Sequence, residues 1–186
     1  MAKENKTKYA LLGVLSQESG SGYDIKKFCD SSIGYFWNEN YGHIYPVLKK
    51  MEEERLITKE VKQTVGNPTR NIFSITQEGK EELEKWLMLP VEKKPIRSEL
   101  LLKIFLSKDI PVKNIIEKIQ KLKQDCEKDL MEYSKLEKIF TSGNIEVDKK
   151  NLVLWLSTIK YGKYAEETQL KWCEETIKSL ESIEDL

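Results

Sequence analysis

Residues 37–57, WNENYGHIYPVLKKMEEERLI, form the stretch that decides the fold. Three of its apolar residues recur at helical spacing and share one side of a helix: Ile44, Leu48 and Met51. Three other residues, each four apart, share the opposite side: Tyr41, Tyr45 and Lys49. The pattern predicts an amphipathic helix that buries one side in a core and leaves the other side free to bind.

The residues on either side of this helix predict where it starts and which element comes after it. Asn40 is a good N-cap, because its side-chain oxygen can accept a hydrogen bond from a first-turn amide, so the helix should begin near Tyr41. Residues 58–76, TKEVKQTVGNPTRNIFSIT, read as two short strands joined by a turn at residues 66–69. By alternation, the buried face of this hairpin should hold Ile57, Val61, Val65, Phe73 and Ile75. A helix followed directly by a polar hairpin is typical of a winged helix-turn-helix.

Two shorter helices are expected before this stretch. Residues 7–15, TKYALLGVL, form an apolar block that suits a first helix, with three leucines facing the core: Leu11, Leu12 and Leu15. After a turn at residues 19–22, residues 23–32 form the support helix of the motif. Its expected core residues are Tyr23, Ile25, Phe28 and Cys29. Phe36 and Trp37, in the following link, are expected to pack beneath a helix.

Composition narrows the class of protein. The 186 residues allow one domain or two small ones, and the 39% hydrophobic content is sufficient for a packed core. No apolar run approaches the roughly 18 residues of a membrane span, and the N-terminus lacks the apolar core of a signal peptide, so we expect a cytoplasmic protein. The net charge is zero, with 31 basic and 31 acidic residues. DNA binding would therefore depend on local geometry and not on bulk charge.

The sequence offers little for catalysis or for binding a metal ion. The three cysteines, Cys29, Cys126 and Cys173, lie far apart and are expected to be buried free thiols. His43 is the only histidine, which argues against a zinc site and against the usual general base. Because no phosphate-binding loop or nucleophile motif is present either, we expect neither an enzyme nor a cofactor.

The second half of the chain is helical in pattern. A helix over residues 77–89 ends at a linker between Pro90 and Pro95, followed by a short apolar helix within residues 98–107. Pro111 then opens a helix toward Phe140 whose apolar stripe is close to a heptad: Ile115, Ile119, Leu122, Cys126, Leu130, Tyr133 and Phe140. Residues 141–144 break it, and residues 148–183 form another long helix. The two can fold back as an antiparallel hairpin.

Apolar residues beyond a single stripe leave such a hairpin short of partners within one chain, which favours dimerisation. The alternative is a self-contained bundle with the N-terminal module.

These segments resemble a known family. The N-terminal YALLGVL, SGYDIKK, IYPVLKKMEEERLITKE and ITQEGKEELEKWL are similar to the PadR family of bacterial transcription regulators, whose motif is an IYP-x-L segment in the recognition helix. The C-terminal ELLLKIF and IKYGKYAEETQLKW resemble the virulence-activator-like dimerisation domain of its longer members. The resemblance implies a mainly α fold with a small β-hairpin. Residues 1–90 would be the winged helix-turn-helix domain and residues 91–186 the helical dimerisation domain.

The resemblance also implies a function. A homodimer would place its two recognition helices, residues 41–55 here, about one DNA turn apart on a pseudo-palindromic operator in double-stranded DNA. The residues expected to contact DNA are Asn40, Tyr41, Tyr45, Lys49, Lys62 and Arg70, with His43, Lys50 and Thr69 as second-rank candidates. Arg55 stands where many relatives have a glycine that closes the recognition helix, so this turn cannot rely on the left-handed conformation that glycine adopts easily.

Two interpretations of function stay open. The first is a transcriptional repressor, released by a small aromatic effector of the kind that several family members sense. The aromatic residues of the last helix are expected to be core and identify no effector site: Trp155, Tyr161, Tyr164 and Trp172. The rival is a winged-helix module that pairs with another regulator protein instead of reading DNA, an interpretation that the zero net charge favours. A redox switch through Cys126 or Cys173 is a weaker hypothesis, because nothing nearby in the sequence lowers a thiol pKa.

Overall fold

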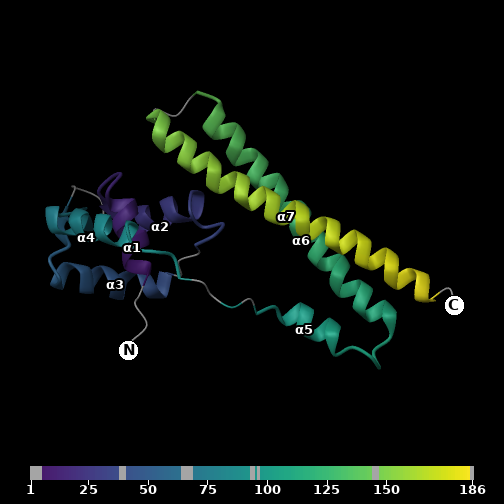
Figure 1. Ribbon diagram of the computed structural model, residues 1–186. Helices are drawn as coiled ribbons and strands as arrows, with labels where there is room; N and C mark the ends of the chain where they lie inside the picture. Colours follow the sequence, from purple (N-terminus) through teal and green to yellow (C-terminus); the bar gives the residue numbers. More distant parts are fainter. Residues whose placement is uncertain are drawn as a thin grey trace. The chain divides into compact units, whose positions relative to one another are not determined.

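The computed structural model describes residues 6–37, 41–63, 69–92, 95, 97–143 and 147–184. The chain divides into two compact units, residues 1–93 and 94–186, each of which is described by itself. The predicted fold class, mainly α with a small antiparallel sheet in a winged-helix unit and long C-terminal helices, is confirmed (Figure 1). None of the described helices is long and apolar enough to cross a membrane.

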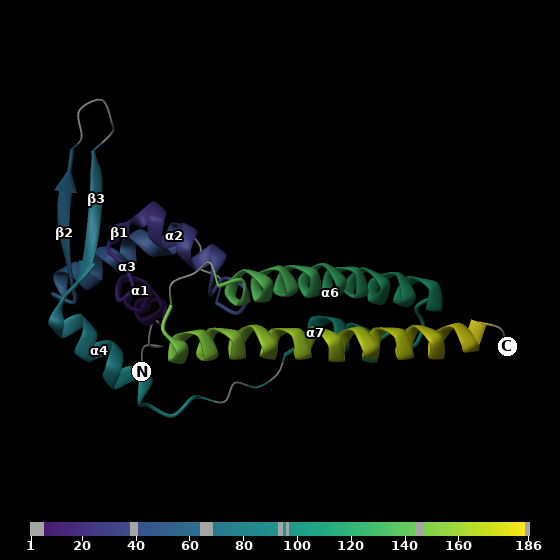
Figure 2. The ribbon, with the colours of Figure 1, turned by 90° about the horizontal axis from the view of Figure 1, so that it is seen from above.

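The N-terminal unit contains four helices and a three-stranded sheet. The elements in chain order are α1 (Thr7–Leu15), β1 (Gly20–Ser21), α2 (Gly22–Ser31), α3 (Tyr41–Glu53), β2 (Ile57–Lys62), β3 (Arg70–Ile75) and α4 (Gln77–Leu87). The sheet has the antiparallel order β1-β3-β2, in which β2 and β3 are the predicted hairpin and β1 is a short strand that we did not predict. Figure 2 shows β2 and β3 extending away from the helices as a wing.

The core of this unit forms around one side of α3. Ile44, Leu48 and Met51 are at most 1% exposed, as the helical spacing predicts. They pack in one cluster with the three leucines of α1, which are buried as expected. The start of α3 at Tyr41 also agrees with the prediction, although Asn40, the expected N-cap, lies outside the described residues.

Four expected core positions of the N-terminal unit are wrong. In α2 only Ile25 and Cys29, four residues apart, face the core, whereas Tyr23 is 64% exposed and Phe28 is 37% exposed. The physical reason is helix geometry: at 3.6 residues per turn, Tyr23 lies on the side of α2 opposite Ile25, and Phe28 lies at the margin of the side that Ile25 and Cys29 occupy. Phe36 is also exposed, in the link after α2.

The fourth wrong position is in the wing. Val61 is 59% exposed, because it pairs with Asn71 in the part of the hairpin that extends beyond the core. Phe73 and Ile57, closer to the base of the hairpin, are buried as predicted. Val65 and most of the predicted turn, residues 66–68, lie outside the described residues.

The end of α3 is closed by an arginine in the left-handed conformation. Arg55 has φ 59°. Its backbone N–H donates to the carbonyl of Glu52 at 3.0 Å, and the N–H of Leu56 donates to the carbonyl of Met51 at 2.9 Å. This pair of bonds is the Schellman motif, which usually relies on glycine at the position that Arg55 holds. The chain therefore makes this turn with an arginine, without the easy left-handed conformation of a glycine.

Thr76 and Gly79, at the start of α4, hold this turn from the other side. The Thr76 hydroxyl donates to the carbonyl of Arg55 at 2.8 Å, and the Thr76 N–H donates to the carbonyl of Leu56 at 3.0 Å. Thr76 also caps α4 by accepting from the N–H of Gly79 at 3.0 Å. A Cβ on Gly79 would lie 2.1 Å from the carbonyl oxygen of Leu56, so α4 can approach this closely only with glycine there.

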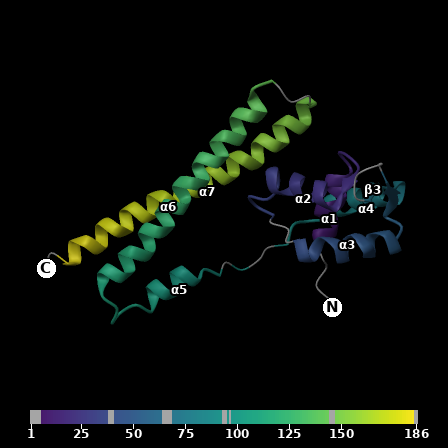
Figure 3. The ribbon, with the colours of Figure 1, turned by 180° about the vertical axis from the view of Figure 1, so that it is seen from behind.

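The C-terminal unit is a helical hairpin with a short preceding helix: α5 (Glu99–Phe105), α6 (Val112–Thr141) and α7 (Lys149–Glu184). Figures 1 and 3 show α6 and α7 lying side by side along most of their length, as the antiparallel hairpin predicts. Of the predicted stripe on α6, Ile115, Ile119, Cys126 and Tyr133 are buried. Ion pairs between the two helices join Lys163 to Glu137 at 2.7 Å and Lys123 to Glu174 at 2.9 Å.

All three cysteines are buried free thiols, as predicted. Burial raises the pKa of Cys126 to about 11, although its sulfur accepts a hydrogen bond from the side-chain amide of Gln169 at 3.2 Å. Burial also raises the pKa of Cys173. A higher thiol pKa lowers the fraction of reactive thiolate, which argues against the redox hypothesis.

Replacing Arg55 with glycine should stabilise the protein. The left-handed conformation costs an ordinary residue roughly 1–2 kcal/mol, part of which is offset by the greater freedom of glycine in the unfolded chain. We therefore expect Arg55→Gly to raise the free energy of unfolding of the N-terminal unit by about 0.5–1 kcal/mol, as measured by urea denaturation. Gly79→Ala, at the same junction, should lower it by about 3 kcal/mol through its clash with the Leu56 carbonyl. A loss of stability in Arg55→Gly would contradict this account of the turn.

Candidate nucleic-acid interface

The outward side of α3 presents the residues predicted to bind DNA. Tyr45 is 49% exposed and the Lys49 side chain is 79% exposed, so both are accessible. Tyr41 and His43 belong to α3, but their side chains lie outside the described part of the chain. Within the described residues, the helix therefore presents a half-buried tyrosine and an exposed lysine one turn apart.

The described end of the wing concentrates positive charge. Lys62 and Arg70 are direct partners in the register of β2 and β3, so two cations lie opposite each other on neighbouring strands. Directly opposed like charges destabilise a hairpin, so this pair does not stabilise the fold. Such a pair is better suited to a surface that meets a polyanion.

A hollow joins the helix to the wing. It is lined by Ser21, Gly22, Tyr23, Tyr45, Thr69, Arg70 and Asn71. Tyr45 and Arg70 were predicted separately, from the helix and from the turn, and the structure brings them to the two sides of one concave surface. Thr69, a second-rank candidate, lies there as well. The hollow also contains the start of α2, which was not predicted to be part of the site.

Gly22 allows the ring of Tyr45 to lie against the start of α2. A Cβ on Gly22 would come within 2.8 Å of three atoms of this ring, so no larger residue fits without moving the tyrosine. The Ser21 hydroxyl accepts from the N–H of Asp24, and the Asp24 carboxylate accepts from the N–H of Ser21, which together form a capping box. This cap starts α2 at Gly22 and so places the glycine beneath the ring.

Tyr23 is the site residue that sequence reasoning missed, because it was assigned to the core. The residue spacing was the signal that could have corrected it, since Tyr23 lies two residues before Ile25 and therefore on the opposite side of the helix. Hydrogen bonds from the side chain and the backbone N–H of Ser21 lower the pKa of Asp24, and the nearby charges of Arg70 and Lys27 lower it further. Arg70 and Lys27 therefore both lie close enough to this end of α2 for their charges to act on Asp24.

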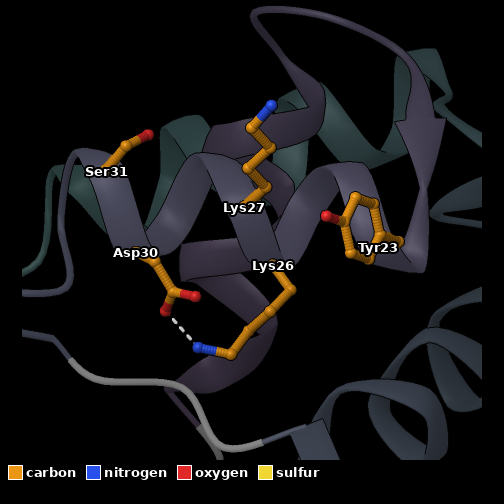
Figure 4. A pocket seen from close by; sticks show the side chains of 5 residues that line it. All are labelled: Tyr23, Lys26, Lys27, Asp30 and Ser31. Atoms are coloured by element: carbon orange, nitrogen blue, oxygen red, sulfur yellow. Dashed lines mark hydrogen bonds and ion pairs between the residues drawn. The ribbon is translucent and has the colours of Figure 1, made fainter.

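The outer side of α2 continues this surface (Figure 4). Tyr23, Lys26, Lys27, Asp30 and Ser31 line a shallow depression along it. Lys26 forms an ion pair with Asp30, whereas Lys27 extends away from that carboxylate. The surface thus contains one lysine, Lys26, that is paired with a carboxylate of its own helix, and another, Lys27, that is directed away from that carboxylate.

The lysines of α3 and β2 are paired with glutamates of the same segments. Each of the four lysines has one of the four glutamates within 4.0 Å: Lys49 with Glu53 at 4.0 Å, Lys50 with Glu54 at 3.7 Å, Lys59 with Glu52 at 3.3 Å and Lys62 with Glu60 at 3.8 Å. The described residues contain no cluster of three or more side chains that could hold a metal ion. The arrangement is suited to non-covalent binding of a polyanion.

Comparison with known proteins finds similarity in both parts of the chain. The family model of the PadR-like transcriptional regulators matches residues 11–85, and that of the C-terminal domain of virulence activator alpha matches residues 96–181. The negative transcriptional regulator PadR of Bacillus subtilis (strain 168) is 34% identical over 100 residues, which are 53% of this chain and 54% of that protein. The matched part therefore spans about half the length of that relative.

Solved structures extend the likeness to the whole chain. The crystal structure of Bacillus subtilis PadR in complex with operator DNA has a TM-score of 0.81 at 21% identity and covers 95% of this chain and 99% of that one. The same protein in complex with p-coumaric acid has a TM-score of 0.76 at 21% identity, with the same coverage. The structure of smu.1604c from Streptococcus mutans UA159 has a TM-score of 0.77 at 30% identity and covers 92% of this chain and 98% of that one.

Replacing Gly22 with alanine should displace the ring of Tyr45. Because this ring is half exposed, it can swing outward, and we expect the free energy of unfolding to change by less than about 1 kcal/mol. In protein labelled with 3-fluorotyrosine, the ¹⁹F resonance of Tyr45, assigned through Tyr45→Phe, should move while the resonances of the tyrosines outside the hollow stay in place. Gly13→Ala is the matched control, because a Cβ there meets nothing within 4 Å. An unchanged Tyr45 resonance in Gly22→Ala would contradict the assigned contact.

Proposed function

The chain belongs to the PadR-like family of transcriptional regulators, and we infer from this that it is a sequence-specific repressor that binds an operator in double-stranded DNA as a homodimer. Members of this family are regulators and not enzymes. The observation that carries the proposal is the hollow between α3 and the wing, where Tyr45 and Arg70 share one exposed surface. The operator complex of the Bacillus relative, which has the same fold, supports it. The protein would act in the cytoplasm, where it meets the chromosome.

Each residue of this surface has a proposed part in DNA binding. Lys49, Lys62 and Arg70 would neutralise phosphates, which supplies affinity but little sequence information. The ring of Tyr45 would pack on a sugar or brace a phosphate. Asn40 and Tyr41 would form hydrogen bonds at the edge of the groove, a role that rests on the sequence because their side chains lie outside the described residues. Tyr23 and Lys27 extend the same surface along α2.

The C-terminal unit supports the homodimer. Residues 91–186 would form the dimerisation domain, with the winged helix-turn-helix in residues 1–90. Several large apolar side chains of α7 are more than half exposed: Val153, Leu154, Tyr161, Tyr164 and Ile183. On α5, Leu102 and Phe105 are exposed as well. A monomer rarely leaves so many large apolar groups in water, whereas a homodimer interface is rich in them.

Release by a small aromatic effector is the proposed form of regulation. The p-coumaric acid complex of the Bacillus relative supports the chemical class. Of the four aromatic residues of α7 that we expected in the core, Tyr161 and Tyr164 are 77% and 55% exposed, whereas Trp172 packs against the core of the unit. Trp155 packs against Phe140 at 5.4 Å between ring centroids. These positions do not form a described cavity, and we assign no effector site.

DNA binding is tested with the purified protein and a duplex from its own promoter region, by fluorescence anisotropy at two salt concentrations. We expect binding that weakens as salt rises, and a loss of at least about 100-fold in Tyr45→Ala, Lys49→Ala, because each protomer loses a phosphate contact and a packed ring. Lys80→Ala, an exposed lysine on α4, is the matched control and should bind as the native protein does. If the native protein binds no DNA, the repressor proposal is wrong and the rival, a module that pairs with another protein, takes its place.

The homodimer is tested by sedimentation equilibrium. The native protein should sediment at twice the chain mass of 21.8 kDa. Leu154→Glu, Tyr161→Glu places two charges seven residues apart on one exposed side of α7, and we expect it to weaken association by at least about 100-fold through the cost of burying them. Lys178→Glu, at an exposed position on the same helix, should leave the dimer intact. A native protein that sediments at the single-chain mass would show that the dimer proposal is wrong.

A further inference from the structure

The elements proposed to meet DNA carry their own counter-charges. Residues 41–62, which include α3 and β2, contain four lysines, one arginine and four glutamates, and each lysine lies within 4.0 Å of a different glutamate. In the two pairs that involve predicted phosphate contacts, both partners are well exposed: 79% and 65% for Lys49 and Glu53, and 59% and 71% for Lys62 and Glu60. By contrast, Arg70 has no carboxylate ion pair among the described residues.

These exposed pairs do little for the stability of the fold. An ion pair in water contributes roughly 0–1 kcal/mol, so a DNA phosphate can displace either carboxylate from its lysine. The displaced carboxylate then attracts a cation from solution, which offsets the cation that the neutralised phosphate releases. A lysine paired in this way therefore adds less to the salt-dependent part of the affinity than an unpaired lysine would.

The same competition acts differently on the two modes of DNA binding. Binding to DNA of unrelated sequence consists almost entirely of cation release and has no fixed register. In such a complex no fixed register keeps the carboxylates away from the phosphates. In an operator complex, contacts to bases and sugars hold one register, in which the lysines face phosphates and the carboxylates can turn to solvent.

We propose that Glu53 and Glu60 are specificity determinants, acting as internal competitors for phosphate that suppress binding to DNA outside the operator. The proposal rests on the proposed function as a DNA-binding regulator. Glu53 and Glu60 are singled out because their lysines are the predicted phosphate contacts. They are also much more exposed than Glu52 and Glu54, whose side chains are 35% and 38% exposed. Arg70 then supplies most of the uncompensated charge at the wing.

The test uses Glu53→Gln, Glu60→Gln, a double variant that removes both charges and keeps the size of the side chains. Its affinity is measured across a salt series for the promoter duplex and for an unrelated duplex of equal length and base composition. Affinity for the unrelated duplex should rise about 10-fold near 0.1 M salt, and the slope of log K against log salt should steepen by up to about 0.9 for each carboxylate removed. Affinity for the promoter duplex should rise by a smaller factor, so that the ratio of the two falls at least about threefold.

Glu81→Gln, Glu84→Gln is the matched control, since it removes two charges from exposed positions on α4. If this control raises affinity as much as the test variant does, bulk charge explains the effect and the proposal is overturned. Unchanged affinity and slope in the test variant, or an equal rise for both duplexes, also overturns it. A native protein that binds neither duplex contradicts the proposed function. In that case the double variant still tests the internal competition. Binding of the variant to the unrelated duplex would support the competition, and binding to neither duplex would overturn it.

Discussion

The carbonyl group of Leu56 is the point on which the N-terminal unit depends. It accepts a hydrogen bond from the Thr76 N–H and lies against Gly79, so the residues that leave α3 are tied to the residues that enter α4. The hairpin of β2 and β3 is the segment between these two points, and its base is therefore held beside the end of α3. This tie determines the direction of the wing relative to the helix, which is the geometry that a groove-binding surface needs.

The sequence predicted the structure best in segments where apolar residues recur at a single helical period. Ile44, Leu48 and Met51 set the phase of α3, and with it the exposure of Tyr45 and Lys49, because a helix with one apolar side has only one way to face a core. The two long C-terminal helices were equally clear, since their apolar stripes run for many turns. The roles of Asn40 and Tyr41 at the groove stay predictions. The assignment of DNA binding to one domain and dimerisation to the other also stays a prediction.

Sequence reasoning failed where burial depends on distant parts of the chain. Tyr23 and Val61 look like core residues by type, but Tyr23 lies on the side of α2 opposite Ile25, and Val61 lies where the wing extends beyond the core. The hollow itself could not be predicted, because it joins the start of α2, the middle of α3 and the start of β3 through tertiary packing. The pairing of Lys59 with Glu52 likewise depends on the way β2 folds back along α3. Composition gave a net charge of zero, but only the fold shows which opposite charges are neighbours.

Because every thiol is buried, the folded protein should react only slowly with maleimides and similar electrophiles. Cys29, Cys126 and Cys173 are at most 1% exposed. The pKa values of Cys126 and Cys173 are raised by burial, so at neutral pH few of their thiols are in the reactive form. A cysteine introduced on the wing or on α7 would therefore be the group that reacts first in the folded protein. Dyes or spin labels can then be attached at a chosen position without first removing the native cysteines, and the packing around them is left intact.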